Sequence, residues 1–541
     1  MRSSPGHHAP LSRRALLRLA SGAAAGALFA PAWIDRAWGQ GQLWPQGDPF
    51  TLGVSAGSPS AEGFVLWTRL APVPLSPDPD RPGGMGNLPV QVAYEIASDP
   101  GMTQVVRRGM GTAEPQYAHS VHVEIKGLQP GRPYWYRFTS GEAQSAVGRA
   151  LTLPARGTVP ERLRLGFVSC SNYELGYFAG YRHLADEQPD LVLFLGDYIY
   201  EYVSRAKSKV RSHSDGVEAA TLPTYRNRYA QYRLDPDLQR LHRETTCLLT
   251  WDDHEVQNDY ADRYSQTFDD PAHFLKRRAA AYQAFYEHLP LKPGLSHPAG
   301  PDLRVYDQFA YGDLATVFML DGRQYRSREA CYGPPMKGGG HLETDKSCPE
   351  RLDPSRSMLG LAQERWLFDG LSRSKGRWNL LGQDVLMAQF AQGIPGGPTA
   401  YWTDGWDGYP ASRGRVLRYL YDHKISNPVV LSGDIHSFWA NQLKLDFDDP
   451  TSPTVATEFV GSSITSTGPN YDVFNSLMGG SPHVRFFDSR VRGYVSVDVT
   501  AQRMVARLRA ISDREDPKAT VSTLRTFAVE DGKPGPVEMA G

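Results

Sequence analysis

Two kinds of hydrophobic pattern divide this chain. Between residues 50 and 154, apolar and polar residues alternate, as in 90–96 and 121–125, which is typical of half-buried antiparallel strands. From about residue 162 the pattern changes to continuous apolar runs, Leu163–Val168 and Leu191–Leu195, with a short helical stretch at 178–185 between them. Strand, helix and strand in about thirty residues predict a βαβ unit.

These patterns predict a small all-β domain followed by an α/β domain. We place a β-sandwich of the immunoglobulin or fibronectin type at 48–155, an α/β catalytic domain at 160–515 and a C-terminal tail at 516–541. In the sandwich, the turn Pro130–Gly131 precedes Tyr134 and Tyr136. This order resembles a tyrosine corner, in which one of the two hydroxyls returns to the backbone. A helix at 271–289 presents an aromatic stripe that we assign to the core.

The N-terminus carries a different pattern. Arg13 and Arg14 precede a weakly apolar, alanine-rich stretch at 19–29, and small residues follow near Gly39. The segment 1–39 resembles a twin-arginine (Tat) signal peptide, which implies the Tat translocase as a partner and a periplasmic or secreted protein. The alternatives are an amphipathic anchor or a retained membrane span. A span needs about 20 apolar residues, more than this stretch offers, and we expect no stable span elsewhere.

Composition narrows the functional classes. The 541 residues carry a formal net charge of -1, and removal of 1–39 takes away five arginines and one aspartate, which leaves -5. A mildly acidic surface gives no electrostatic basis for specific nucleic-acid binding. Four cysteines are too few to form a disulfide framework. Cys331 and Cys348 flank a glycine-rich loop and can pair after export, Cys247 fits a buried strand, and Cys170 is left unpaired.

Residues able to bind metals follow four separate apolar strands. The carboxyl ends of parallel strands meet at one edge of a sheet, where α/β proteins bind their ligands. A thiol, a phenol, an imidazole and several carboxylates at that edge predict a binuclear or larger metal site. The candidate ligands are Cys170, Asp197, Tyr200, Asp253, Asp434 and His436.

Each of these residues also has an ordinary structural interpretation. Cys170 alone is more often a buried structural thiol, Asp197 a turn residue and Tyr200 a core aromatic side chain. Residues 251–254 can cap a helix, and Arg323 and Arg326 can form an ion-paired strand edge. Their occurrence after four strands in succession favours the metal site over these separate explanations.

The order of the motifs resembles the calcineurin-like metallophosphoesterase superfamily, and within it the PhoD-type alkaline phosphatases. The segments 196–200, 251–255 and 432–436 carry the resemblance, with Cys170, Asp253 and Asp434 at positions where the wider superfamily has other ligands. Further matching segments are 53–57, 67–69, 321–327, 406–410 and 457–461. The resemblance implies a four-layer α-β-β-α sandwich behind the all-β domain. One motif departs from the superfamily, because Gln383 stands where a histidine ligand is expected.

The donor types indicate which metals are present. A thiolate from Cys170 and a phenolate from Tyr200 suit Fe³⁺, with His436 completing its ligands. Asp197 can bridge to a neighbouring ion, and Asp253 and Asp434 offer the oxygen ligands that Ca²⁺ prefers. The PhoD-type resemblance implies the same iron and calcium.

Such a centre predicts an exported alkaline phosphatase and phosphodiesterase, acting as a monomer on small phosphate mono- and diesters. His254 is our candidate general acid, and Asn258 and Arg326 are candidates to bind phosphate oxygens. The closest alternative is a phospholipase D-like phosphodiesterase. Two others remain: a surface binding protein whose metals are structural, and a haloperoxidase-like oxidation at iron.

Overall fold

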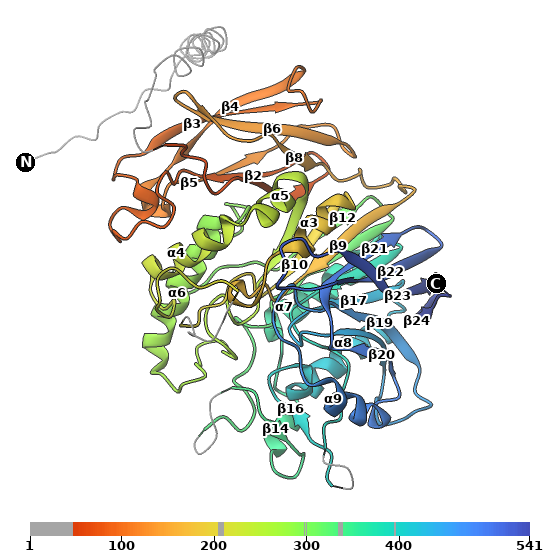
Figure 1. Cartoon of the computed structure of the whole chain (residues 1–541). Helices are drawn as coiled ribbons and strands as arrows, with labels where there is room; N and C mark the ends of the chain where they lie inside the picture. Colours follow the sequence, from red (N-terminus) through yellow and green to blue (C-terminus); the bar gives the residue numbers. More distant parts are fainter. Residues whose placement is uncertain are drawn as a thin grey trace, which may run out of the picture.

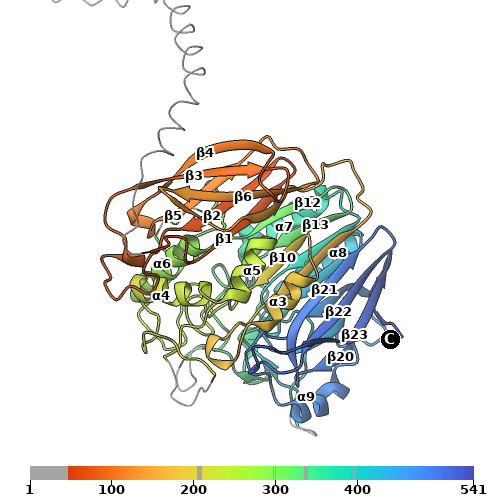
Figure 2. The ribbon, with the colours of Figure 1, turned by 45° about the horizontal axis from the view of Figure 1, so that its top comes forward.

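The structure of this protein is a computed structural model, which describes residues 47–203, 210–296, 298, 300–333, 339–393 and 397–540. The proposed signal segment 1–39 lies outside the described residues. Two mixed sheets pack face to face in the α/β part, and the all-β part lies at one end of them (Figures 1 and 2). Within the described residues, no helix is both long enough and apolar enough to cross a bilayer.

Three buried parallel strands form the centre of the first sheet, and two of them have the bounds predicted from sequence. On one side of this centre the sheet continues through antiparallel strands to the C-terminus. In order along the sheet, the strands of this half are β24 (Lys533–Glu538), β23 (Val521–Glu530), β22 (Arg503–Ile511), β21 (Arg492–Val499), β9 (Leu163–Val168), β10 (Leu191–Leu195) and β11 (Thr246–Thr250).

The second sheet has seven strands, of which four neighbours, β13, β15, β17 and β19, run parallel. Its apolar face packs against the first sheet, and Leu193 and Leu380 belong to one buried cluster between them. In spatial order its strands are β12 (Asp307–Tyr311), β13 (Ala315–Met319), β15 (Trp378–Gly382), β17 (Pro428–Ser432), β19 (Thr454–Val460), β18 (Phe438–Lys444) and β20 (Val484–Asp488).

Helices cover the outer face of each sheet, which completes the four α-β-β-α layers predicted from the resemblance. The first sheet packs against α3 (Ala179–Asp186), α4 (Leu222–Arg233), α5 (Pro236–Glu244) and α6 (Pro271–His288). The second packs against α7 (Gly360–Arg373) and α8 (Pro410–Asp422). A short helix, α9 (Tyr471–Leu477), follows β19 and lies outside these layers (Figure 1).

Helices α4 and α5 were not predicted from the sequence. Arginines and tyrosines make up most of the buried residues of α4, so the helix lacks the aliphatic stripe by which an amphipathic helix is recognised. Arg226 of α4 binds the buried Glu287 of α6 at 2.6 Å, and Arg233 lies over the ring of Trp67 at 4.4 Å. Ion pairs and cation–π contacts therefore hold this helix where aliphatic contacts were expected.

The all-β part is a sandwich, but one of its two sheets continues into the catalytic part. Strands β1 (Val54–Ser60), β2 (Gly63–Arg69) and β5 (Ser120–Ile125) extend the first sheet beyond β11, because β1 pairs with β11 in parallel. A Cβ at Gly57 would lie 2.7 Å from the carbonyl oxygen of Pro290, so this junction requires glycine. The facing sheet contains β3 (Val90–Ala97), β4 (Val105–Ala113), β6 (Pro133–Ser140), β7 (Ala143–Gln144) and β8 (Gly148–Leu151).

Residues 516–541, set apart from sequence as a tail, contain strands of the same large sheet. β23 pairs along its length with β22, and β24 pairs with β23. Phe527 of β23 is buried in the cluster between the two sheets. The label of a tail was therefore wrong for most of this segment, since its alternating residues complete the sheet edge.

A disulfide ties down a loop at the carboxyl end of the second sheet. Cys331 and Cys348 are bonded, as their positions around a glycine-rich loop suggested. The loop contains β14 (Leu342–Glu343), which pairs antiparallel with β16 (Tyr401–Trp402). Cys170 and Cys247 are buried free thiols.

The sandwich contains the predicted tyrosine corner, and Tyr134 is the tyrosine that makes it. Its hydroxyl accepts a hydrogen bond from the Gln129 amide at 3.0 Å. The hydroxyl of Tyr136 is buried without a hydrogen-bond partner among the described residues.

This pair gives a matched test. We expect Tyr134→Phe to lower the free energy of unfolding by about 1 kcal/mol, the net value of a typical hydrogen bond. Tyr136→Phe removes a hydroxyl that makes no such bond, so it should be neutral or stabilising. Chemical denaturation of the two variants measures both values, and an equal loss in both would contradict the assignment of the corner.

Candidate metal centre

The predicted metal ligands occupy loops that leave the parallel strands at one rim of the molecule. Four of them have left-handed backbone conformations: φ is 61° at Cys170, 52° at Asp197, 63° at Asp434 and 52° at His436. Non-glycine residues rarely adopt this conformation, and those that do cluster at functional sites. The sharp turns let each side chain follow directly on a buried strand.

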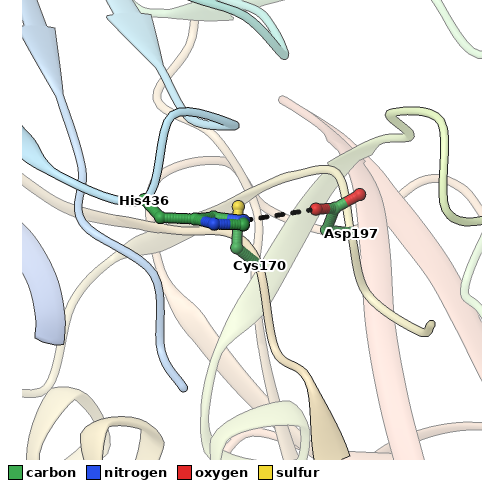
Figure 3. Close-up of side chains that lie close together, drawn as sticks. All are labelled: Cys170, Asp197 and His436. Atoms are coloured by element: carbon green, nitrogen blue, oxygen red, sulfur yellow. Dashed lines mark ion pairs between the residues drawn. The ribbon is translucent and has the colours of Figure 1, made fainter. Parts of the chain in front are cut away.

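Cys170, Asp197 and His436 form the first group of converging donors (Figure 3). One ligand atom from each lies within 4.8 Å of the others. Tyr200 belongs to the same group, because its hydroxyl lies 2.7 Å from Asp197 Oδ2 and 3.2 Å from His436 Nε2. His436 Nδ1 is 2.9 Å from the Thr467 carbonyl oxygen, and that contact directs Nε2 towards the group.

Asp197, Asp253 and His254 form a second group of the same size. Asp197 therefore belongs to both groups, as a bridging carboxylate would. Its Oδ1 and the Oδ1 of Asp253 are buried without a hydrogen-bond partner among the described residues. Buried carboxylate oxygens are normally paired, so these two atoms indicate a position for a cation.

The electrostatics of the two groups fit bound cations. Burial raises the pKa of the Cys170 thiol well above its usual value, and the Asp197 carboxylate raises it further. Burial also raises the pKa of Asp253, although the charges of His254 and Arg323 act to lower it. The pKa of Asp434 is raised by burial and by the charge of Asp404. Cations stabilise the deprotonated forms that these surroundings otherwise disfavour. The thiol, phenol, imidazole and carboxylates present are therefore suited to hold metal ions.

The pKa of Asp197 shifts in the opposite direction from those of Asp253 and Asp434. Burial acts to raise its pKa, but His254, His436 and the Tyr200 hydroxyl together hold it below its usual value. Asp197 is thus stabilised as a carboxylate between the two groups.

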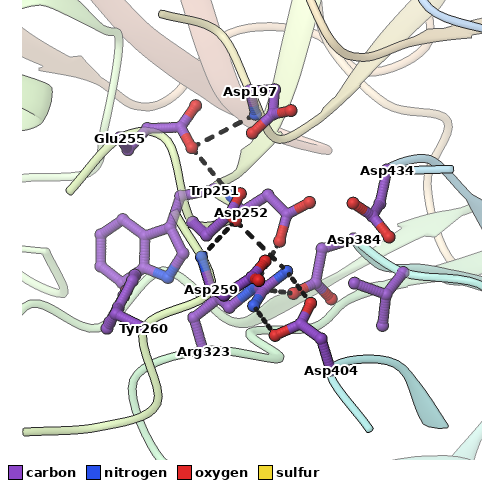
Figure 4. Close-up of polar contacts among 12 residues, drawn as sticks. Asp197, Trp251, Asp252, Glu255, Asp259, Tyr260, Arg323, Asp384, Asp404 and Asp434 are labelled. Carbon is purple, nitrogen blue, oxygen red and sulfur yellow. Dashed lines mark hydrogen bonds and ion pairs between the residues drawn. The ribbon is translucent and has the colours of Figure 1, made fainter. Parts of the chain in front are cut away.

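Arg323 lies among the carboxylates of Asp252, Asp384 and Asp404 (Figure 4). Its side chain is fully buried; Nε donates to Asp252, and its two terminal nitrogens bind both oxygens of Asp404 at 2.7 and 2.9 Å. Asp384 lies 3.7 Å from the same guanidinium, and Asp253 lies 3.9 Å from it. This one cation orients carboxylates from three separate loops.

Glu255 braces the loop that carries Asp197. Its carboxylate accepts hydrogen bonds from the backbone amides of Asp197, Tyr198 and Asp252, at 3.2, 2.6 and 2.9 Å. Burial and the nearby Asp197 raise its pKa to about 8. A Cβ at Gly196, where φ is 99°, would lie 2.4 Å from Asp252 Cβ, so the two loops approach as closely as glycine permits.

His254, a member of the second group, and Asn258, which lies near it, are held by another carboxylate. His254 Nδ1 is 2.7 Å from Glu201 Oε2. The other oxygen, Glu201 Oε1, accepts a hydrogen bond from the backbone amide of Asn258 at 2.8 Å. The Asn258 side-chain oxygen accepts a hydrogen bond from Tyr202 at 2.7 Å. Because that contact occupies the side-chain oxygen, the side-chain nitrogen is the atom of Asn258 that can donate a hydrogen bond to a ligand.

Arg326 does not have the position expected of a phosphate-binding residue. Its side chain is buried, and its terminal nitrogens bind Asp404, Tyr260 and Glu329 at distances of 2.6 to 3.0 Å. Nε has no hydrogen-bond partner among the described residues, but both terminal nitrogens bind neighbouring groups of the protein. These contacts favour a role in holding Asp404, and direct phosphate binding by Arg326 stays a prediction.

Gln383 explains the departure from the superfamily motif. Its amide nitrogen lies 2.6 Å from Ser432 Oγ, and its oxygen accepts the indole N–H of Trp406 at 3.0 Å. The side chain thus ties β15 to the end of β17. The next residue, Asp384, is the one that faces the charged cluster.

Several residues of the site were missed by the sequence analysis: Asp252, Glu255, Glu201, Arg323, Asp384 and Asp404. Asp384 follows the strand at 378–382, so the strand-end rule applied to the other ligands would have found it. Arg323 lies in a segment that carried the resemblance, but its charge suggested a surface ion pair. Asp404 follows the two-residue strand β16 in an aromatic-acidic stretch, 401–409, that was interpreted as an ordinary packed loop in preference to the lip of a pocket.

A recess opens beside Asp434 and His436. Its volume is about 410 Å³, and it is lined by residues from several loops and from α9. It gives ligands a path to one side of the donor groups.

Comparisons with known proteins agree with this architecture. The model of the family described as "PhoD-like phosphatase" matches residues 165–508, and the model of its N-terminal domain matches residues 37–154. The chain is 42% identical over 495 residues to alkaline phosphatase D of Bacillus subtilis (strain 168), covering 90% of this chain and 82% of that protein. A solved structure titled "Structure of PhoD" superposes with a TM-score of 0.84 at 42% identity, covering 91% of this chain and 92% of that one. The resemblance inferred from the motifs is confirmed, and the chain belongs to the PhoD-like phosphatase family.

Proposed function

We propose that this protein hydrolyses phosphate monoesters and diesters and releases inorganic phosphate from the monoesters. The observation that carries the proposal is the convergence of Cys170, Asp197, Tyr200, Asp253 and His436 at one rim, with Asp434 lining the adjoining recess beside His436, in a chain of a phosphatase family.

The donor types support an assignment of the metals. Fe³⁺ would be held by Cys170, Tyr200, His436 and Asp197, since thiolate and phenolate favour a strongly polarising ion. Ca²⁺ would be held by Asp253, Asp434 and Asp197, since calcium prefers oxygen ligands. When bound, such ions supply positive charge for the phosphoryl oxygens and lower the pKa of water.

The protein's own groups then position the ester. His254 lies beside Asp253 and is held by Glu201 at 2.7 Å, which orients the imidazole to give a proton to the departing alkoxide oxygen. Burial acts to lower the pKa of His254, but Asp253 and Glu201 raise it well above its usual value. The side-chain amide nitrogen of Asn258 donates a hydrogen bond to a phosphoryl oxygen. Arg323 and Arg326 keep the acidic loops in place.

Export through the Tat pathway is part of the proposal. The twin-arginine segment 1–39 supports it, with cleavage near Gly39 and a periplasmic or secreted monomer as the product. The disulfide between Cys331 and Cys348 also supports it, because disulfides persist in oxidising compartments.

Removal of one buried thiol tests the metal centre. We expect Cys170→Ala to lose bound iron and at least 100-fold in kcat, because the thiolate is one of its ligands, while the variant remains folded. Cys247→Ala removes a comparably buried thiol on β11 and should keep metal and activity at a cost of about 1 kcal/mol in stability. Elemental analysis measures the bound iron of both variants, circular dichroism their folding, and phosphatase assays their kcat.

The same pair separates the proposed enzyme from a binding protein with structural metals. If Cys170→Ala unfolds the domain as it loses metal, the binding-protein alternative gains support. If it retains iron and full activity, the ligand assignment is wrong.

The general-acid role of His254 predicts a dependence on the leaving group. His254→Gln should lower kcat by about 10²–10⁴-fold on an alkyl phosphate. The loss should be smaller on 4-nitrophenyl phosphate, whose leaving group needs little protonation. Glu201→Gln should also lose more kcat on the alkyl phosphate than on 4-nitrophenyl phosphate, with smaller losses on both than His254→Gln. Equal losses on both substrates would contradict proton donation by His254.

The phosphodiesterase alternative is tested by comparing 4-nitrophenyl phosphate with its bis(4-nitrophenyl) diester. We expect the metal-loaded enzyme to hydrolyse both. Turnover of the diester alone would replace the proposed alkaline phosphatase with a phosphodiesterase of the phospholipase D-like type.

A further inference from the structure

The recess beside Asp434 and His436 has an apolar interior that the hydrolytic chemistry does not use. The two ligand residues and Ile435 form one wall. The apolar lining consists of Leu342, Leu386, Phe390, Trp402, Trp406 and Phe474. A phosphoryl group at the donor groups would therefore have a large apolar surface within reach.

Two of these side chains are exposed at the mouth of the recess. Leu342 on β14 and Trp402 on β16 are paired in register, and their exposed fractions are 49% and 40%. The indole of Trp402 packs on Gly340, where a Cβ would lie 2.5 Å from the ring. The disulfide-closed loop that carries β14 thus presents an ordered apolar edge to solvent.

The inner wall is rigid because it is continuous with the hydrophobic core. Phe390 packs against Trp439 with ring centroids 5.1 Å apart and against Phe474 at 5.2 Å. Trp406 is fully buried and held by Gln383. A preformed apolar pocket binds a ligand without the cost of ordering its walls.

Four aspartates line the recess: Asp434 is a proposed metal ligand, Asp259 accepts a hydrogen bond from the Gly340 backbone amide at 2.9 Å, and arginines neutralise the other two. Asp404 binds Arg323 at 2.7 Å, and Asp407 binds Arg413 at 2.6 Å. Their charge is therefore met by neighbouring guanidinium groups, which argues for an uncharged occupant over a cationic one.

We propose that this recess binds an aryl or alkyl ester group of the substrate while its phosphoryl group lies at the donor groups, so that the enzyme prefers phosphate esters with an apolar substituent. This inference rests on the proposed function. Benzene fills a cavity of about 150 Å³, so 410 Å³ has room for a ring or a short alkyl chain. The lining meets the usual description of a ligand pocket, which is mainly apolar with a few polar groups at one side.

Non-hydrolysable phosphonates test the inference by direct binding. On the metal-loaded enzyme, isothermal titration calorimetry should show hexylphosphonate and benzylphosphonate binding at least about tenfold more tightly than methylphosphonate. Burial of the apolar group should also make the heat-capacity change of binding more negative. In Trp402→Ala and Leu342→Ala, the preference over methylphosphonate should fall several-fold.

Tyr421→Ala is the matched control. Tyr421 lies on α8 with 47% of its surface exposed, and it does not line the recess. Its loss should leave the preference unchanged. The two mouth residues are exposed, so their replacement should leave the fold intact, which circular dichroism checks.

The outcomes separate this inference from the function on which it rests. Equal affinities for methyl and hexyl phosphonates on an enzyme that hydrolyses phosphate esters overturn the inference alone. Tighter binding of a choline-bearing phosphonate than of the hexyl compound also overturns it, in favour of a cationic occupant. If the protein neither hydrolyses phosphate esters nor binds methylphosphonate, both proposals fail.

Discussion

Concentrated negative charge at the rim of the two sheets is the constraint on which the rest of this structure depends. Moving an unpaired carboxylate from water into a protein interior costs several kcal/mol. Arg323 compensates Asp252 and Asp404 directly. The free oxygens of Asp197 and Asp253 have no such partner among the described residues. The proposed cations supply the missing compensation, so metal binding and stability of this rim are physically linked.

Backbone strain is found at the same charged rim. Left-handed conformations at Cys170, Asp197, Asp434 and His436 each cost of order 1–3 kcal/mol. They persist because the surrounding strands are buried on both faces and leave the loops little freedom. Hydrogen bonds from three backbone amides to Glu255 add a further restraint. The loops are therefore positioned before any ligand arrives, which is what a catalytic centre requires.

Features that depend on local patterns could be predicted from the sequence. The strands at 163–168 and 191–195 were predicted because continuous apolar runs between turn residues are distinctive. Helix α4 was not predicted because it buries arginines, whose partners lie far away in the chain.

The same limit applies to the site. Side chains that directly follow strands could be listed from sequence, and the structure brings the predicted metal ligands to one rim. Arg326 and Gln383 illustrate the limit, because their motifs do not reveal which neighbouring groups bind their side chains. The aromatic-acidic stretch 401–409 allowed a pocket lip, but the part played by Asp404 depends on Arg323 and Arg326, which lie far away in the chain.

The parallel pairing of β1 with β11 has a consequence for how the protein is organised. A shared sheet makes the sandwich and the hydrolase parts one cooperative unit, unlike two modules joined by a linker. A fragment lacking the sandwich would expose the hydrogen-bonding groups of β11 as a bare edge, a template for aggregation. The N-terminal domain therefore protects the catalytic sheet, and this explains its presence without assigning it any chemistry.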